Sequence, residues 1–225
     1  MNAIQDNLKA VGERIEMALG RAGRAPGAAR LLAVSKTFPA AAVQEAYAAG
    51  QRCFGENRVQ ELAAKAPALP SDCEWHLIGH LQQNKVRQAL GYAAWIHSVD
   101  TPALLERIQL LADEVGAAPK LLLEVNVSGE ESKFGFAPDA VEAALAGMPA
   151  GPAACVGLMT VAPMGADASA LRGVFGGLRQ LRDRLQSRLG LSLPELSMGM
   201  SSDLEVAIAE GATIVRVGTA IFGHR

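Results

Sequence analysis

Eight short apolar runs, separated by stretches of helical period, constrain the fold of this chain more than any other feature. The runs are LLAVSK, RCFGEN, EWHLIGH, WIHSVD, KLLLEVNV, ACVGLMT, ELSMGM and TIVRVG. Short apolar runs bounded by turn signals are typical of strands that are buried on both faces. A strand followed by a helix, repeated eight times, is the pattern of a parallel sheet closed into a barrel. The sequence therefore predicts an α/β fold, a single (β/α)8 barrel of the TIM type.

An open, doubly wound sheet is the alternative layout for such a pattern. Eight units with no evident reversal of strand order favour the closed form. Before the first run, residues 1–23 carry apolar side chains at helical spacing and end on glycines, which predicts a leading helix. The chain has 225 residues, of which 50% are hydrophobic, and this is enough for one core. We expect one domain over residues 1–225, with the leading helix at 1–23 and the barrel at 31–225.

Helix start and stop signals stand between the runs. Thr101 is the expected N-cap of a helix, with Pro102 at its first position and Gly116 at its end. A second helix, rich in arginine, is predicted from the apolar face that begins at Leu171 and continues to Leu185. These signals support the strand and helix alternation independently of the apolar runs.

Composition excludes several classes of function. The net charge is −2, so no overall positive field would attract a nucleic acid. Neither a secretory leader nor an apolar stretch long enough to cross a membrane is evident. The cysteines Cys53, Cys73 and Cys155 are odd in number and widely spaced, which fits neither a disulfide framework nor a zinc site. We expect a cytoplasmic protein with no nucleic-acid or membrane partner.

Two small-residue turns near the end of the chain, GMSSD and GTAIFG, follow the seventh and eighth predicted strands. In barrels of this type, the loops after these strands often hold phosphate groups. Glycine lets the backbone approach an anion, and hydroxyls and helix N-termini supply donors. Gly199, Ser201, Ser202, Gly218 and Thr219 together predict a phosphate site. The alternative is that these residues only cap helices and turn the chain.

A lysine and an arginine are predicted near this site. Strand alternation places Leu32, Val34 and Lys36 on one side of the first strand, and Ile214 and Arg216 on one side of the last. These strands become neighbours when the barrel closes. A nearby positive charge and partial burial favour a neutral, nucleophilic amine, which can form a Schiff base with an aldehyde. The alternative is that both cations only solvate the rim of the barrel.

Other polar residues fall at predicted strand ends, namely Asn57, His76, His80, Glu124 and Asn126. The two histidines have the spacing of a metal-binding pair on a helix, but the apolar alternation around them predicts a strand. We therefore expect no metal site. Each histidine is alternatively a buried group satisfied by a neighbour, and Glu124 alternatively pairs with a nearby cation.

Five stretches of the chain resemble one family closely. They are LLAVSKT, FGENRVQE, WHLIGHLQQNK, EVNVSGEESKFG and LSMGMSSDLEVAIAEGATIVRVGTAIFG, in this order from residue 31 to the end. They are similar to the pyridoxal 5′-phosphate (PLP) homeostasis proteins, which are related to the barrel domain of alanine racemase. A phosphate, an aldehyde and an aromatic ring, the three parts of PLP, are what the residues above are suited to hold.

The resemblance implies a set of cofactor-binding residues. The set comprises Lys36, Asn57, His80, Asn126, Ser197, Met200, Ser201, Arg216, Gly218 and Thr219. By this resemblance, Lys36 would form the internal aldimine with PLP, and Arg216 would face the pyridine nitrogen. Ser201, Gly218 and Thr219 would hold the phosphate. No catalytic residue is implied.

The resemblance also bears on activity. The guanidinium of Arg216 does not give its proton to the pyridine nitrogen, so the ring would be a poor electron sink for carbanions. Alanine racemases use a second base from another domain of a partner subunit, and this chain offers only Tyr47 and Tyr92. We expect a monomeric binding protein rather than an enzyme, one that takes part in intracellular PLP (vitamin B6) homeostasis, with PLP-dependent apo-enzymes as candidate recipients.

Two other functions stay open from the sequence. One is a one-domain amino-acid racemase or an aldolase-like enzyme that uses PLP. The other is a barrel enzyme that does not use PLP and binds the carbonyl of a phosphorylated sugar through Lys36. Absorbance of the purified protein discriminates them, because only a PLP-binding chain carries a visible chromophore.

Overall fold

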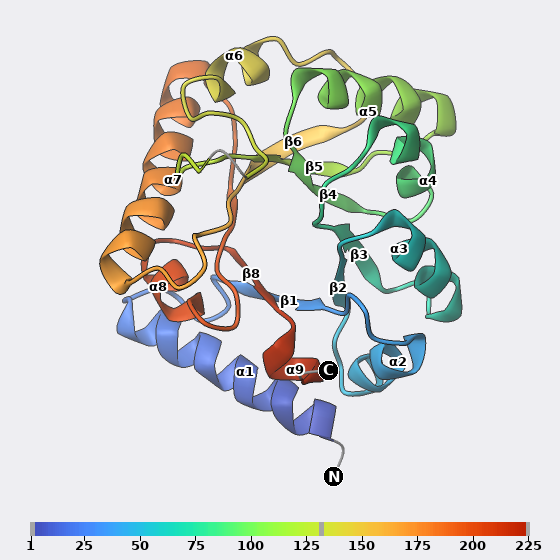
Figure 1. Ribbon diagram of the computed structural model, residues 1–225, viewed down its shortest axis with the longest axis vertical. Helices are drawn as coiled ribbons and strands as arrows, with labels where there is room; N and C mark the ends of the chain where they lie inside the picture. Colours follow the sequence, from blue (N-terminus) through green and yellow to red (C-terminus); the bar gives the residue numbers. More distant parts are fainter. Residues whose placement is uncertain (1–2, 131–132, 224–225) are drawn as a thin grey trace.

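Strands and helices alternate along the chain as predicted, in a computed structural model that describes residues 3–130 and 133–223 (Figure 1). The strands are β1 (Arg30–Val34), β2 (Cys53–Glu56), β3 (Glu74–Leu77), β4 (Trp95–Val99), β5 (Lys120–Glu124), β6 (Ala154–Met159), β7 (Glu195–Ser197) and β8 (Ile214–Val217). The helices are α1 (Ala3–Arg21), α2 (Ala40–Ala48), α3 (Val59–Lys65), α4 (Val86–Leu90), α5 (Pro102–Val115), α6 (Val141–Ala146), α7 (Ala168–Leu189), α8 (Leu204–Ala209) and α9 (Thr219–Phe222).

The strands form a closed parallel barrel in sequence order, β1 to β8. Closure is made by β1 and β8, where Leu32 lies opposite Arg216. Each strand coincides with one of the apolar runs in the sequence, except that β1 begins one residue before its run, at Arg30. The prediction of a closed (β/α)8 barrel is therefore confirmed, and the open doubly wound sheet is excluded.

Apolar side chains fill both the inside of the barrel and the layer between the strands and the helices. The inner cluster comprises Leu32, Trp95, Leu122, Met159 and Ile214. A larger cluster packs between the outer faces of the strands and the apolar faces of the helices. Leu32 and Ile214 face the inside of the barrel. The sides of β1 and β8 that carry them therefore face inward, and they bring Val34 and Arg216 to the mouth of the barrel.

The predicted helix signals are present in α5. The Thr101 side chain accepts a hydrogen bond from the backbone N–H of Leu104, Pro102 is the first helical residue, and Gly116 ends the helix with a φ of 67°. Only a residue that tolerates the left-handed region fits this C-terminal position, which favours glycine. The arginine-rich helix predicted from Leu171 is α7, which Asp167 caps.

The leading helix α1 packs on the helices that follow the last two strands, α8 and α9, as well as on α2 (Figure 1). Arg14 donates to the Glu205 carboxylate on α8 and to the carbonyl of Ser201, and Asn7 donates to the carbonyl of Ile221 on α9. The first helix of the chain therefore supports the last two loops of the barrel. Among the described residues, none of the helices has both the length and the apolar character needed to cross a membrane.

Candidate functional site

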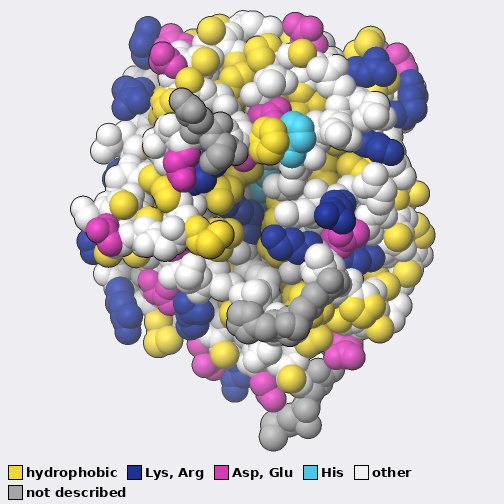
Figure 2. All heavy atoms as spheres, viewed as in Figure 1, with side chains coloured by type: hydrophobic (Ala, Val, Ile, Leu, Met, Phe, Trp, Pro, Cys, Tyr) yellow, Lys and Arg dark blue, Asp and Glu magenta, His cyan; other side chains and the backbone are white. Residues whose placement is uncertain are grey.

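A cavity of about 420 Å³ opens at the carboxyl ends of the strands. Its lining residues are Val34, Lys36, Asn57, Ile78, Val161, Met200, Ser201, Ser202, Arg216, Gly218 and Thr219. This is the end of a (β/α)8 barrel at which active sites are built. On this face, Lys and Arg side chains gather around a central hollow (Figure 2). The structure thus brings the predicted amine and the predicted phosphate site into one cavity.

Lys36 lies on the turn directly after β1, where its side chain is exposed. This exposure contradicts the expectation of partial burial, because β1 ends two residues earlier and the side chain projects beyond the packed interior. The backbone around it is held on both sides. The Lys65 ammonium donates to the carbonyl of Ser35, and the N–H of Thr37 donates to the Glu61 carboxylate at 2.6 Å. Thr37 has a φ of 70°, a conformation that such bonds must stabilise in a residue other than glycine.

The two predicted turns form one wall of the cavity. The hydroxyl groups of Ser201 and Thr219 lie 3.2 Å apart, although they come from different loops. Gly218 lies so close to β1 that a Cβ atom there would be 3.1 Å from the carbonyl oxygen of Val34. Gly199 has a φ of 90°, and a Cβ atom there would lie 2.5 Å from that of Ala207. Glycine is therefore required at position 199, and Gly218 lets its loop pack tightly against β1. The wall that these loops form presents hydroxyl groups to the cavity.

Arg216 lies at the base of the cavity and is almost entirely buried. Its Nη1 donates to the Ser197 hydroxyl at 2.7 Å, and its Nη2 donates to the carbonyl of Thr160 at 2.9 Å. Burial lowers the pKa of Arg216 to about 10, while Glu124 and Asp203 oppose this shift. The guanidinium therefore stays charged at neutral pH and places a fixed positive charge beneath any ligand.

Ser197 does not line the cavity, although the family resemblance includes it among the cofactor-binding residues. It is the last residue of β7, and its hydroxyl is fully buried between Arg216 and His97. An inward-facing residue of a strand lies below the loops that follow the strand, so it supports the cavity from beneath. Met200, by contrast, does line the cavity and is partly exposed.

His80 and Asn126 lie in hollows next to the cavity rather than in it. The His80 ring bonds to the Asp100 carboxylate at 2.8 Å and stacks on Phe134 with ring centroids 4.1 Å apart. It lines a hollow of about 500 Å³ that also includes Asn57. Asn126 bonds to the carbonyl of Glu130 within its own loop. Their roles in ligand binding stay predictions.

Glu124, at the end of β5, lines a smaller hollow that shares Val161 with the cavity. Burial raises the pKa of Glu124 to about 7, with a further contribution from the Asp100 charge, while Arg216 and His80 oppose the shift. This carboxyl group therefore changes its charge near neutral pH, close to the guanidinium at the base of the cavity.

Comparison with known proteins identifies the family of the chain. The family model for the alanine racemase N-terminal domain matches residues 2–225. The pyridoxal phosphate homeostasis protein of Aquifex aeolicus is 46% identical to this chain, over 100% of this chain and 99% of that protein. The chain belongs to the pyridoxal phosphate homeostasis protein family. A second member, from Pseudomonas aeruginosa, is 45% identical over 100% of this chain and 97% of its own length. The family resemblance predicted from the five stretches is confirmed.

Solved structures agree with this assignment to the pyridoxal phosphate homeostasis protein family. PipY of Synechococcus elongatus, solved with PLP bound, is 43% identical and has a TM-score of 0.84, covering 98% of this chain and 100% of PipY. D-threonine aldolase from Filomicrobium marinum has a TM-score of 0.77 over 97% of this chain and 60% of its own, but only 15% identity. The aldolase therefore shares the fold alone.

Some residues that line or support the cavity were not predicted from the sequence. Ile78 and Val161 give the cavity apolar walls, and both directly follow the carboxyl end of a strand or lie in the loop after one. Their position at the strand ends was the available signal, but apolar residues there do not stand out from the core. His97 was also missed, although alternation along β4 could have placed it inside the barrel.

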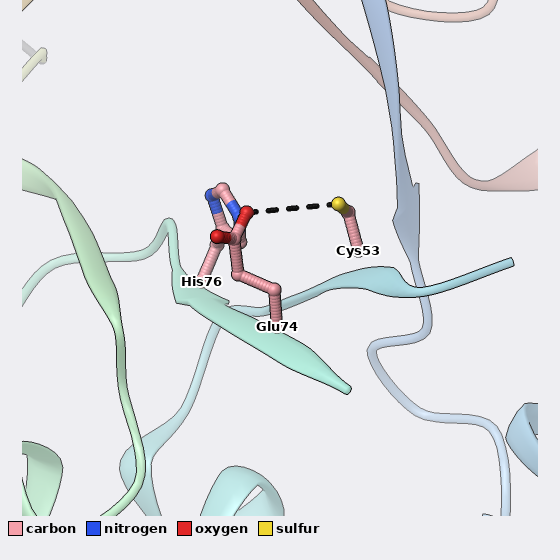
Figure 3. A group of neighbouring side chains, drawn as sticks. All are labelled: Cys53, Glu74 and His76. Carbon is pink, nitrogen blue, oxygen red and sulfur yellow. Dashed lines mark hydrogen bonds and ion pairs between the residues drawn. The ribbon is translucent and has the colours of Figure 1, made fainter. Parts of the chain in front are cut away.

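The opposite end of the barrel holds a group of side chains whose ligand atoms are close enough for a metal ion. These are Cys53, Glu74 and His76, within 4.8 Å of one another and the one such group among the described residues (Figure 3). The Glu74 carboxylate already bonds to His76 and lies 3.6 Å from the Arg30 guanidinium. Burial and Glu74 raise the pKa of the Cys53 thiol to about 11. Because a cation is already present and the thiolate is disfavoured, we interpret this group as a polar cluster; the absence of a metal site stays a prediction.

Proposed function

We propose that this protein binds PLP in the cavity at the carboxyl ends of the strands and holds it reversibly, as part of intracellular PLP homeostasis. The observation that carries the proposal is that Lys36 lies in the same cavity as the hydroxyl wall made by Ser201 and Thr219. In the proposal, the whole chain acts as one PLP-binding barrel domain in the cytoplasm, as a monomer. All three of its cysteines are free thiols, which suits a reducing compartment.

The donor set fits each part of PLP. Ser201, Gly218 and Thr219 would hold the phosphate, because hydroxyl groups and a close backbone approach suit an anion. Ile78 and Val161 would cover the faces and edges of the ring with apolar atoms. When bound, the aldehyde of PLP would condense with the Lys36 amine with loss of one water, a covalent and reversible attachment.

Arg216 would meet the pyridine nitrogen of the ligand as a hydrogen-bond donor. Its guanidinium lines the cavity and has no acceptor group, so it favours a ring nitrogen with a free lone pair. A neutral ring withdraws electrons weakly, which disfavours most PLP-dependent reactions. This residue supports a binding role over an enzymatic one.

The tyrosines of the chain also support a binding role. The hydroxyl of Tyr47 donates to Asp72 on the outside of the barrel, and Tyr92 lines a hollow with Glu74 and Trp95. Neither tyrosine lines the cavity. A two-base racemisation needs a second proton donor on the far side of the ligand, and these residues do not supply it. We therefore propose that the protein does not catalyse racemisation efficiently; transfer of PLP to apo-enzymes fits the same site.

Absorbance titration of the purified protein with PLP tests this proposal. We expect a visible absorbance band when PLP is added. After borohydride reduction, we expect mass spectrometry to find the PLP-modified residue at Lys36. Lys36→Ala is expected to lose the band, whereas Lys85→Ala, which removes a cation from the neighbouring hollow, should retain it. A band of undiminished strength in Lys36→Ala would contradict the assignment. Turnover of alanine, serine or threonine that depends on Lys36 would favour an enzyme instead.

A further inference from the structure

An unbroken chain of hydrogen bonds crosses the inside of the barrel, from its amino end to the base of the cavity. It joins Glu74, His76, His97, Ser197 and Arg216, which come from strands β3, β4, β7 and β8. The successive distances are 2.9 Å from the carboxylate to His76 Nε2, 2.9 Å from His76 Nδ1 to His97 Nε2, 2.9 Å from His97 Nδ1 to the serine hydroxyl, and 2.7 Å to Arg216.

The middle of this series of hydrogen bonds is isolated from water. His97 and Ser197 are fully buried, and His76 is 1% exposed. The outer end is Glu74, whose carboxylate lies beside the His76 ring in Figure 3 and is about one-third exposed. Leaving a buried polar group without a hydrogen-bond partner costs free energy. Each group in the series therefore keeps its partners, and the orientation of one group constrains the next.

The two terminal groups of this hydrogen-bond chain, Glu74 and Arg216, fix the direction of every hydrogen bond between them. A guanidinium only donates, so the Ser197 oxygen accepts from Arg216. An ionised carboxylate only accepts, so His76 carries its proton on Nε2 and leaves Nδ1 bare. His97 then donates from Nε2 to that bare nitrogen, and its own Nδ1 accepts from the serine hydroxyl.

The protonation states of the members agree with this direction. The hydrogen bond from His76 lowers the pKa of Glu74 to about 2, so the carboxylate is ionised at neutral pH. Burial lowers the pKa of both His76 and His97, so the two rings are neutral. Two cations near these hydrogen bonds, Arg30 beside Glu74 and Arg216 itself, also lower the pKa of His97 and disfavour its charged form.

We propose that Glu74, His76, His97 and Ser197 act as a relay of positioning residues, which locks both imidazoles as Nε2–H tautomers and fixes Arg216 for the ligand of the cavity. With Nη1 tied to the relay and Nη2 tied to the carbonyl of Thr160, the guanidinium has both terminal nitrogens held. The carboxylate at one end and the guanidinium at the other give the relay opposite charges at its termini. The part of this inference that concerns the ligand rests on the proposed binding of PLP.

Nuclear magnetic resonance of the ligand-free protein tests the relay itself. The chain contains four histidines, so the ring nitrogens of ¹⁵N-labelled protein can be resolved, and His80→Asn assigns the signals of the His80 ring. We expect His76 and His97 to show a protonated Nε2 and a bare Nδ1 at neutral pH. A proton on Nδ1 of either ring, or a doubly protonated ring, would overturn the relay.

Two variants test whether the ends of the relay set its direction. Glu74→Ala removes the terminal acceptor at a partly exposed position, so we expect the two rings to become mixtures of tautomers. Glu195→Ala is the matched control, because it removes another carboxylate that pairs with Arg30 but makes no bond to the relay. Unchanged tautomers in Glu74→Ala, or an equal change in Glu195→Ala, would show that packing alone sets the ring states.

A PLP titration tests the effect on Arg216. We expect Ser197→Ala to weaken PLP binding about tenfold, because the guanidinium loses its buried acceptor. The matched control is Ser98→Ala, which removes another fully buried hydroxyl, the one that donates to the carbonyl of Gly79. Equal affinities for both variants would overturn the positioning role. Wild-type protein that binds no PLP would contradict the proposed function instead. The existence of the relay would then be tested by the tautomers of His76 and His97 in the ligand-free protein.

Discussion

At the scale of single residues, a buried ion pair lies directly behind the amine of the cavity. Lys65 Nζ donates to Glu56 at 2.7 Å, and the hydroxyl of Ser35 donates to the same carboxylate oxygen at 2.6 Å. The Glu56 side chain is fully buried, and its second oxygen has no hydrogen-bond partner among the described residues. The pair thus fixes the backbone next to Lys36 at a cost in desolvation.

Removing the cation of this pair should destabilise the protein strongly. We expect Lys65→Met to lower the free energy of unfolding by about 3 kcal/mol or more at pH 7, because it leaves a buried carboxylate uncompensated. Burial already raises the pKa of Glu56. Loss of the cation raises it further, so the deficit should shrink as pH falls and the carboxyl group becomes neutral. Urea denaturation at several pH values measures this, with exposed Lys9→Met as the control.

The Glu124 carboxyl group should make ligand binding depend on pH. Because burial raises its pKa to about 7, it gains a negative charge as pH rises through neutrality. That charge lies near Arg216 and opposes the binding of an anionic ligand, so PLP affinity should fall about fivefold between pH 6 and 8. Fluorescence or absorbance titrations measure this. Glu124→Gln is expected to flatten the dependence, and identical profiles for both proteins would refute the role.

Much of the cavity could be predicted from single residues, because strand alternation and turn chemistry act locally. Strand alternation predicts that Lys36 and Arg216 lie near each other on the first and last strands, and they do line one cavity. The partners of Arg216 could not be predicted, since Ser197 and Thr160 lie 19 and 56 positions away in sequence and on other strands or loops. The burial of Ser197 below the cavity depends on the depth at which β7 ends, which no local pattern specifies.

At the scale of elements, the cap of α5 offers a local contribution to stability that is separate from the cavity. We expect Thr101→Ala to lower the free energy of unfolding by about 1 kcal/mol, since the N–H of Leu104 loses its acceptor. Thr101→Ser keeps the hydroxyl and should retain most of this stability. Thermal or urea denaturation measures both. PLP affinity should be unchanged in the two variants, and a loss of affinity would show that α5 is coupled to the site.

The strands were predicted well from the sequence, because they repeat along the chain as similar short apolar runs. The strands lie within the predicted apolar runs, apart from Arg30 at the start of β1, because strands buried on both faces read as continuous apolar sequence. Several intervening helices are short, such as α6 and α8 with six residues each. Such helices carry few start and stop signals, so their bounds follow from packing against the barrel rather than from local sequence.

At the scale of the whole molecule, the first helix and the last loops of the chain form one structural unit. Strand β8 closes the barrel against β1, and α1 covers the helices that follow β7 and β8. The periodicity of residues 1–23 predicted a helix but not its place on the barrel. That place is specified by side chains such as Arg14, whose guanidinium reaches the loop of Ser201.

This arrangement predicts that a residue on α1 affects ligand binding from outside the cavity. Arg14→Leu keeps much of the apolar stem but removes the donors to Glu205 and to the carbonyl of Ser201. We expect PLP affinity to fall about fivefold, because the phosphate wall loses a bond that holds its backbone. Lys9→Leu is the matched control, since Lys9 is exposed on the same helix and, among the described residues, forms an ion pair only with Glu13. Equal affinities for both variants, measured by absorbance titration, would show that α1 stabilises the fold without shaping the cavity.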